Sequence, residues 1–155
     1  MSDQLQYSVN GHWMAGARGS VAAQDVERTI EFSAPPEFRG EPGFWTPEHF
    51  LLAAVASCFI STFRAIAGNS KFDPLALDVA VEGRLEKGQN GFDFPRVVLR
   101  PALTIREESD RARAYRLLEK TERGCLVARA LKCEVTMEAR IDSPQGADRG
   151  EPLVA

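Results

Sequence analysis

The feature that most constrains this chain is residues 46–68, TPEHFLLAAVASCFISTFRAIAG, which predict one long helix. The stretch opens with a threonine that can cap free N–H groups, and Pro47 suits the first helical position. No charged residue occurs from Phe50 to Phe63. A helix that is apolar on every side is buried or spans a membrane, and this uncharged run is shorter than the roughly 20 residues that a span needs. We therefore expect a central core helix with Cys58 in its middle.

The bulk composition favours one domain in a reducing compartment. The 155 residues carry 19 Lys and Arg against 22 Asp and Glu, a formal charge of −3, and no basic block indicates nucleic acid binding. We expect a single domain at 1–142 and a loose tail at 143–155. The N-terminal residues hold no apolar signal segment, and three cysteines fit a cytoplasmic protein better than a disulfide framework. No spacing of His or Cys indicates a metal site.

The segment before the helix predicts short strands and an ordered loop. Residues 5–32 alternate loosely between glycine turns and apolar residues, which indicates two or three strands. Residues 33–45 are dense in Pro and Gly and cannot form a long regular element. Phe38, Phe44 and Trp45 either cover the core or wall a pocket beside the helix.

The segment after the helix predicts a hairpin. Residues 77–87 alternate apolar and polar side chains, as a half-buried strand does. Asn90 and Gly91 mark a turn, and residues 96–106 form the second strand of an antiparallel pair. Pro101 predicts an edge position or a bulge, because proline cannot donate to a ladder.

The last third predicts a helix at 109–124, a short helical turn at 126–131 and a closing strand at 132–142. Cys125 follows Gly124 directly and so lies at a helix exit. Cys133 falls on the apolar face of the last strand, where we expect a small core residue. The inner stripe of the helix consists of Ala114, Leu117, Leu118 and Thr121.

Cys58 and Cys125 are far apart in sequence and can meet only through the tertiary fold. If they meet, peroxidatic and resolving chemistry becomes possible: a thiolate attacks a peroxide, and the second thiol condenses with the sulfenic acid. Cys58 lies about three turns from the helix start, where the helix dipole gives little help, and burial raises a thiol pKa. A reactive Cys58 therefore needs a nearby cation. The candidates are Arg18 and Arg39, and Glu48 could orient either through a carboxylate–guanidinium pair.

These residues together resemble the OsmC/Ohr family, the osmotically inducible protein C and organic hydroperoxide resistance proteins. The likeness rests on PEFRGEPGFWTPEHFLLAAVASCF and GCLVARALKCEVT and covers about residues 10–141. The resemblance implies an α+β fold, with antiparallel sheets around a long central buried helix, in an intertwined homodimer. By match, it implies that Cys58 is the peroxidatic thiol, Cys125 the resolving thiol and Glu48 the carboxylate partner of the catalytic arginine.

The chain departs from the family pattern at two places. Leu126 follows Cys125 where the family often has proline. The catalytic arginine does not align uniquely, since Arg18 resembles the Ohr-type position and Arg39 lies nearer the OsmC-type one. The chain is similar to general OsmC-like members, whose physiological substrate is not established.

The resulting expectation is a cytoplasmic cysteine-based peroxidase for organic hydroperoxides, with inorganic hydroperoxides as further candidate substrates. It needs no cofactor beyond an external dithiol reductant, which the resemblance implies is of the lipoyl type, and it has no nucleic acid or membrane partner. The expected composite site joins Glu48 of one chain to Cys58 of the other. The alternatives are a thiol redox sensor and a non-catalytic ligand-binding dimer. Four aromatic residues would line the substrate or ligand pocket: Phe44, Trp45, Phe59 and Phe63.

Overall fold

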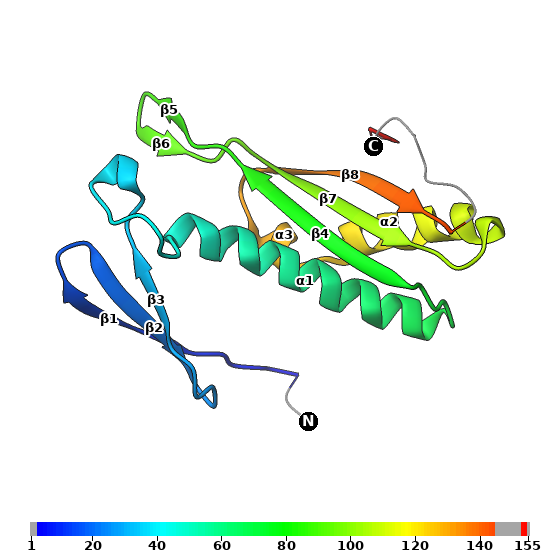
Figure 1. Ribbon diagram of the computed structural model, residues 1–155, viewed down its shortest axis with the longest axis horizontal. Coiled ribbons are helices and arrows are strands. Elements are labelled where there is room, and N and C mark those ends of the chain that lie inside the picture. The colour runs from blue at the N-terminus through cyan, green and yellow to red at the C-terminus, as the bar shows by residue number, and fades with distance from the viewer. Residues whose placement is uncertain (1–2, 145–152, 155) are drawn as a thin grey trace. The chain divides into compact units, whose positions relative to one another are not determined.

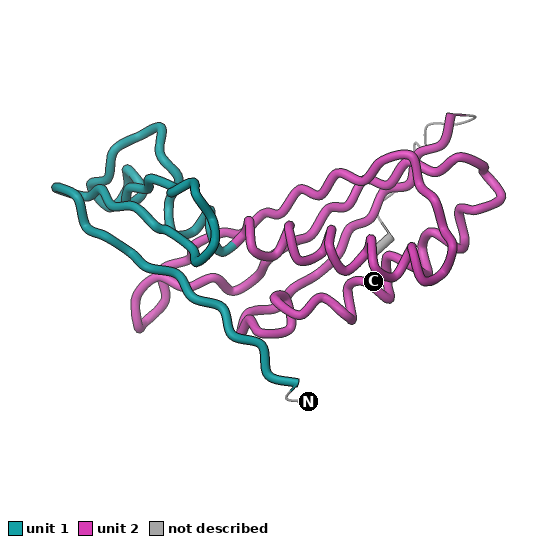
Figure 2. Tube along the Cα trace, turned by 90° about the horizontal axis from the view of Figure 1, so that it is seen from below, with its two compact units in different colours: residues 1–51 teal, residues 52–155 magenta. Residues whose placement is uncertain are grey.

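The computed structural model of the protein describes residues 3–144 and 153–154. The chain divides into two compact units, residues 1–51 and residues 52–155, which are coloured separately in Figure 2. The boundary falls inside the long helix α1, Pro47–Asn69. We describe each unit by itself.

The first unit contains a small antiparallel sheet. Its strands are β1 (Val9–Ala15), β2 (Arg18–Ala23) and β3 (Ile30–Ser33), in the order β1-β2-β3 (Figure 1). The strands predicted in this region are therefore confirmed. The loop that follows is irregular apart from one 3-10 turn, η1 (Pro36–Phe38).

The start of α1 is fixed by a reciprocal cap. The Thr46 hydroxyl accepts a hydrogen bond from the His49 N–H at 3.3 Å, and His49 Nδ1 accepts one from the Thr46 N–H at 3.1 Å. This is a capping box in which histidine replaces the usual Glu or Gln at the third helical position. The predicted helix start at the threonine and proline is confirmed.

The burial of α1 differs from the expectation. Within one chain the helix buries a single stripe at four-residue spacing, and its opposite side carries exposed Ser57 and Ser61. The prediction of burial on every side is therefore wrong for the isolated chain. The physical reason for this difference is that a single sheet covers only one side of a helix. The buried stripe consists of Val55, Phe59, Phe63 and Ala67.

The second unit is built on a sheet of four strands in the order β4-β7-β8-β9. β4 (Ala76–Gly83) and β7 (Arg96–Thr104) form the predicted antiparallel pair. A small hairpin of β5 (Glu86–Gly88) and β6 (Gly91–Asp93) extends from its turn (Figure 1).

The pairing of β7 with β8 (Glu134–Asp142) is parallel, so the sheet is mixed and not wholly antiparallel as expected. β7 is also an inner strand, so the edge position expected from Pro101 is wrong. The ladder to β8 tolerates the proline because pairing is interrupted at Arg100 and Pro101. Proline has no N–H to donate there.

A helical crossover joins the parallel strands β7 and β8. It consists of η2 (Glu108–Asp110), α2 (Arg111–Gly124) and α3 (Leu126–Ala130). The predicted inner stripe of α2 is confirmed, since its buried residues are the four expected from the periodicity. α1, α2 and the inward side chains of the sheet enclose one apolar core, whose largest fully buried members include Phe59, Leu99, Leu103 and Leu118.

The C-terminal segment differs from the expectation in two details. Cys133 lies just before β8, is half-buried and is not among the core residues, so the core position expected for it is wrong. β8 begins at Glu134, one residue after Cys133, so the Cys133 side chain lies at the margin of the core. Leu153–Val154 form β9, which pairs with β8, while residues 145–152 and 155 of the expected tail lie outside the described residues.

Candidate thiol site

The fold brings Cys58 and Cys125 together in the second unit. Cys58 projects from the middle of α1, and Cys125 forms the junction between α2 and α3. Both are free thiols, and each one affects the pKa of the other. Cys125 is fully buried, whereas Cys58 is partly exposed. The fold thus brings both candidate thiols into one site, because the N–H that contacts Cys58 Sγ belongs to Val127, two residues beyond Cys125.

Further donors surround the Cys58 sulfur. The Val127 N–H donates to Cys58 Sγ at 3.4 Å, and Thr62 Oγ1 lies 3.9 Å from the same sulfur. Thr62 is one turn further along α1, and Val127 belongs to the first turn of α3. The site is therefore assembled from one long helix and the crossover that packs against it.

The surroundings of the two thiols shift their pKa values in opposite directions. Burial tends to raise the pKa of Cys58, but hydrogen bonds from the Val127 N–H, Cys125, Thr62 and the Leu126 N–H outweigh it and lower the pKa below its ordinary value. Burial raises the pKa of Cys125, the Ala128 N–H offsets part of this, and the neighbouring Cys58 raises it further. Cys58 is thus the thiol of the two that ionises more readily.

Sequence reasoning sought a cation for Cys58 and missed these uncharged donors. Each group that lowers the pKa of Cys58 belongs to residues 52–155, and none carries a formal charge. The signal in the sequence was Gly124-Cys125-Leu126: a helix exit followed directly by a new helical turn leaves unpaired N–H groups beside the cysteine.

Arg18, one of the two candidate arginines, is held within the first unit. Its guanidinium pairs with Glu31 on the adjacent strand at 2.6 Å and lies over the Phe44 ring at 4.6 Å. Glu31 was not anticipated as its partner. Among the described residues, Arg18 Nε and Glu48 Oε2 are buried and make no hydrogen bond.

Arg39, the other candidate, is exposed and occupies a special backbone position. Its φ is 64°, in the left-handed region that costs a non-glycine residue about 1 kcal/mol or more. The adjoining Gly40 packs so tightly that a Cβ would lie 1.5 Å from the Ala34 carbonyl oxygen. The loop therefore fixes the backbone of Arg39 while leaving its side chain in solvent.

The four aromatic residues expected around a substrate do not share one role. Phe59 and Phe63 are 0% and 1% exposed and pack inside the core, so a ligand-lining role does not fit them. Phe44 and Trp45 line an open hollow of about 280 Å³ in the first unit, together with Gly43 and His49.

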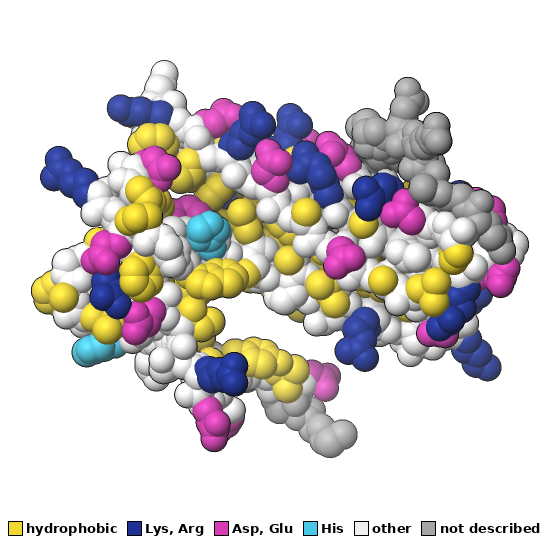
Figure 3. All heavy atoms as spheres, viewed as in Figure 1, with side chains coloured by type: hydrophobic (Ala, Val, Ile, Leu, Met, Phe, Trp, Pro, Cys, Tyr) yellow, Lys and Arg dark blue, Asp and Glu magenta, His cyan; other side chains and the backbone are white. Residues whose placement is uncertain are grey.

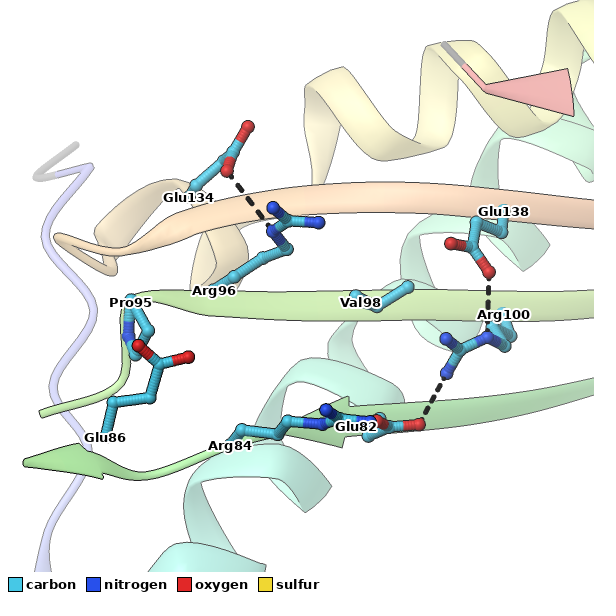
Figure 4. Close-up of a pocket in the computed structure, with 9 residues that line it drawn as sticks. All are labelled: Glu82, Arg84, Glu86, Pro95, Arg96, Val98, Arg100, Glu134 and Glu138. Carbon is cyan, nitrogen blue, oxygen red and sulfur yellow. Dashed lines mark hydrogen bonds and ion pairs between the residues drawn. The ribbon is translucent and has the colours of Figure 1, made fainter.

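A second hollow, of about 480 Å³, lies on the outer side of the larger sheet, away from the thiols (Figure 4). Its centre is Arg100, which pairs with Glu82 and Glu138 at 2.9 Å each. Arg96 pairs with Glu134 at 3.5 Å nearby. On the face shown in Figure 3, acidic and basic side chains lie next to each other. The ion pairs of Arg100 and Arg96 mean that most charges lining this hollow are paired.

A mixed sheet backed by a long helix, with two free thiols where that helix meets the crossover, defines a thiol protein of the α+β class. The sequence profile described as OsmC-like protein matches residues 40–140. The chain belongs to this family, which confirms the resemblance seen in the sequence. α1 has the length and composition of a membrane span, but in this soluble family it is a core helix.

Individual relatives agree with this assignment. The chain is 26% identical over 152 residues to the uncharacterised protein YmaD of Bacillus subtilis, covering 96% of this chain and 100% of YmaD. It is 26% identical over 136 residues to peroxiredoxin OsmC of Escherichia coli, covering 85% and 94% of the two chains. Among solved structures, the OsmC-like protein VCA0330 of Vibrio cholerae superimposes with a TM-score of 0.77 at 19% identity, covering 88% and 99%. This last likeness shows the fold.

Proposed function

We propose that the protein is a thiol peroxidase that reduces organic hydroperoxides through Cys58 and Cys125. The observation that carries the proposal is the contact of the Val127 N–H with Cys58 Sγ at 3.4 Å, which brings Cys58 to the turn that holds Cys125; there the pKa of Cys58 is lowered and that of Cys125 is raised. A peroxidase needs one thiolate to attack and one protonated thiol to follow. The name of the Escherichia coli relative, peroxiredoxin, supports the same chemistry.

The reaction proceeds in two balanced steps. The Cys58 thiolate attacks one oxygen of ROOH, the O–O bond breaks, and the alkoxide takes up a proton to leave as ROH, so that Cys58 becomes a sulfenic acid. The Cys125 thiol then attacks the sulfenic sulfur. A disulfide forms, and the hydroxyl leaves with the Cys125 proton as water.

Turnover requires a two-electron reductant. We propose an external dithiol, of lipoyl type by the family resemblance, that attacks the Cys58–Cys125 disulfide and leaves as its own disulfide. Such a cycle suits the cytoplasm, where thiols are kept reduced.

We further propose that the working form is a homodimer with a composite site. The side of α1 opposite its buried stripe carries small side chains, Ala54, Ser57, Ser61 and Ala65, which a symmetric partner would cover. Glu48 and Cys58 are ten residues apart on α1, about 15 Å along its axis, so one arginine does not readily serve both within a chain. The unpaired Glu48 Oε2 supports an arginine pairing completed in the dimer.

The test is consumption of cumene hydroperoxide in the presence of a dithiol. Cys58→Ser removes activity, whereas Cys125→Ser gives one oxidation event and then overoxidises Cys58, seen by intact mass as two or three added oxygens. Full turnover by Cys58→Ser would refute the proposal. Wild-type protein that binds the hydroperoxide unchanged would indicate a binding protein, and oxidation without recycling by any dithiol would indicate a sensor.

A further inference from the structure

β8 is the last long strand of the larger sheet, and its side away from β7 is an edge of that sheet (Figure 1). At the two ends of β8, the Glu134 N–H donates to the Pro95 carbonyl and the Asp142 carbonyl accepts from the Ile105 N–H, so these groups point toward β7. Successive residues of a strand turn their backbone groups to opposite sides. The residues that face the edge are therefore the odd-numbered ones, Val135, Met137, Ala139 and Ile141.

Two other parts of the chain cover this edge in places. The C-terminal strand β9 lies opposite its middle, where Leu153 pairs with Ala139. At the end of β8, the Arg111 side chain donates to the Ile141 carbonyl at 2.7 Å. In the part of the chain that the structure describes, no strand lies opposite residues 135–137 on this side. An edge with unpaired N–H and C=O groups is a template on which another strand can pair.

We propose that β9 protects the edge of β8, and that without β9 this edge pairs with β8 of a second copy of the chain. β9 has two residues, whereas β8 has nine, so a second β8 offers a much longer partner than β9 does. The proposal goes beyond the peroxidase proposal, and it requires nothing of the thiols.

The charges on β8 favour a second copy as the partner. Two β8 strands related by a two-fold axis run antiparallel. With the axis at Ala139, Arg140 of each copy lies opposite Glu138 of the other, and with the axis at Met137 it lies opposite Glu134. Opposite charges that face each other across two strands stabilise the pair. An axis at Glu138 would instead place two carboxylates opposite each other, which disfavours that register.

The first experiment measures amide hydrogen exchange in the intact protein by NMR. We expect the Ala139 amide, which faces β9, to exchange more slowly than the Met137 amide, which faces the open part of the edge. In a chain of residues 1–152, which lacks β9, the two amides should exchange equally fast at low protein concentration. Both should slow as the concentration rises and the edges pair.

The second experiment measures mass by light scattering across a range of protein concentrations. The chain of residues 1–152 should reach at least double the wild-type mass as the concentration rises. Leu153→Pro should do the same in the full-length chain, because proline lacks the N–H that faces Ala139. Its control, Leu153→Ala, keeps the N–H and should keep the wild-type mass. Circular dichroism verifies the fold of each variant.

A third experiment tests whether β8 itself forms the new contact. Arg140→Glu in the chain of residues 1–152 places like charges opposite each other in both favoured registers and should return the mass to that of the wild type. Arg140→Lys, its control, keeps the charge and should keep the larger mass. Arg140 is exposed and pairs only with exposed or half-buried Asp142 among the ion pairs described, so the substitution leaves the core intact.

Three results would overturn the proposal. The first is an Ala139 amide in the intact protein that exchanges as fast as that of Met137. The second is wild-type mass at every concentration in both the shortened chain and Leu153→Pro. The third is a larger species that persists unchanged with Arg140→Glu. None of these depends on peroxidase activity, so the two proposals fail separately.

Discussion

The N–H of Val127 donates to the sulfur of Cys58 at 3.4 Å, across 69 positions of sequence. This contact joins the crossover between β7 and β8 to the middle of α1. It makes the ionisation of a thiol on one element depend on the backbone of another. Changes in the crossover should therefore alter reactivity even where no side chain of the site is replaced.

The choice between the two candidate arginines can be tested by conservative substitution. Arg18 is half-buried, pairs with Glu31 and stacks on Phe44, whereas Arg39 is exposed. Lysine keeps the charge and loses the planar fork. We expect Arg18→Lys to lower kcat/KM for cumene hydroperoxide by about tenfold or more, the loss of one charge-assisted hydrogen bond, and Arg39→Lys to have little effect. The reverse order would assign the role to Arg39.

The strain at Arg39 gives a separate prediction. Its φ of 64° is easily adopted by glycine, so Arg39→Gly should leave the free energy of unfolding unchanged or raise it by up to about 1 kcal/mol. Urea denaturation measures this. A clear loss of stability would mean that the Arg39 side chain contributes contacts that exceed its backbone strain.

Acid stability should depend on Glu108. Hydrogen bonds from Arg111 and Ser143 lower the pKa of this carboxyl from 4.5 to about 2. A lowered pKa in the folded state means that Glu108 stabilises the fold above its ordinary pKa, and this stabilisation disappears as pH falls from 4.5 to about 2. Glu108→Gln should therefore lower Tm at neutral pH and converge with the wild type at the acid end. Glu107→Gln, its exposed neighbour, is the matched control. A difference in Tm between Glu108→Gln and the wild type that stays constant across this pH range would contradict the prediction.

The cap of α1 makes the helix start sensitive to two side chains. Thr46→Ala removes the acceptor for the His49 N–H and should cost about 1 kcal/mol of unfolding free energy, whereas Thr46→Ser should keep most of it. His49→Gln retains an acceptor for the Thr46 N–H, and His49→Ala does not, so Gln should be the better tolerated. Equal stability of the two His49 variants would show that the reciprocal bond contributes little.

Cys133 lies outside the thiol pair and at the margin of the core. We expect Cys133→Ala to retain dithiol-dependent turnover and to cost little stability. The assay is the same hydroperoxide consumption, with circular dichroism to verify the fold. Loss of activity in folded Cys133→Ala protein would mean that a third thiol takes part in the cycle.

The sequence predicted those elements whose periodicity is strong. The inner stripe of α2 and the alternation of apolar and polar residues in β4 each predict which side of the element is buried, and the structure agrees. The direction in which β8 pairs with β7 was not predictable this way, because alternation is the same in parallel and antiparallel strands. The position of Pro101 on an inner strand followed from that missed pairing.

The sequence indicated which side chains belong to the candidate site, but not which backbone groups contact them. The motif located Cys58 and Cys125, but the donor that contacts the Cys58 sulfur at 3.4 Å is a main-chain N–H of Val127, which any residue except proline supplies. The sequence likewise did not show that Phe59 and Phe63 pack inside the core, because this depends on the elements that cover α1.

The placement of the two thiols ties the redox state of the protein to its resistance to unfolding. A bond between Cys58 and Cys125 would close a loop of about 70 residues, and in the chain-entropy account such a crosslink stabilises the folded state by about 4 kcal/mol. That loop contains β4, β7 and α2, most of the second unit. In the proposed peroxidase cycle, each turnover would therefore carry the chain between a less stable reduced form and a more stable oxidised form. Protein awaiting its reductant would be the form that heat and proteases attack least.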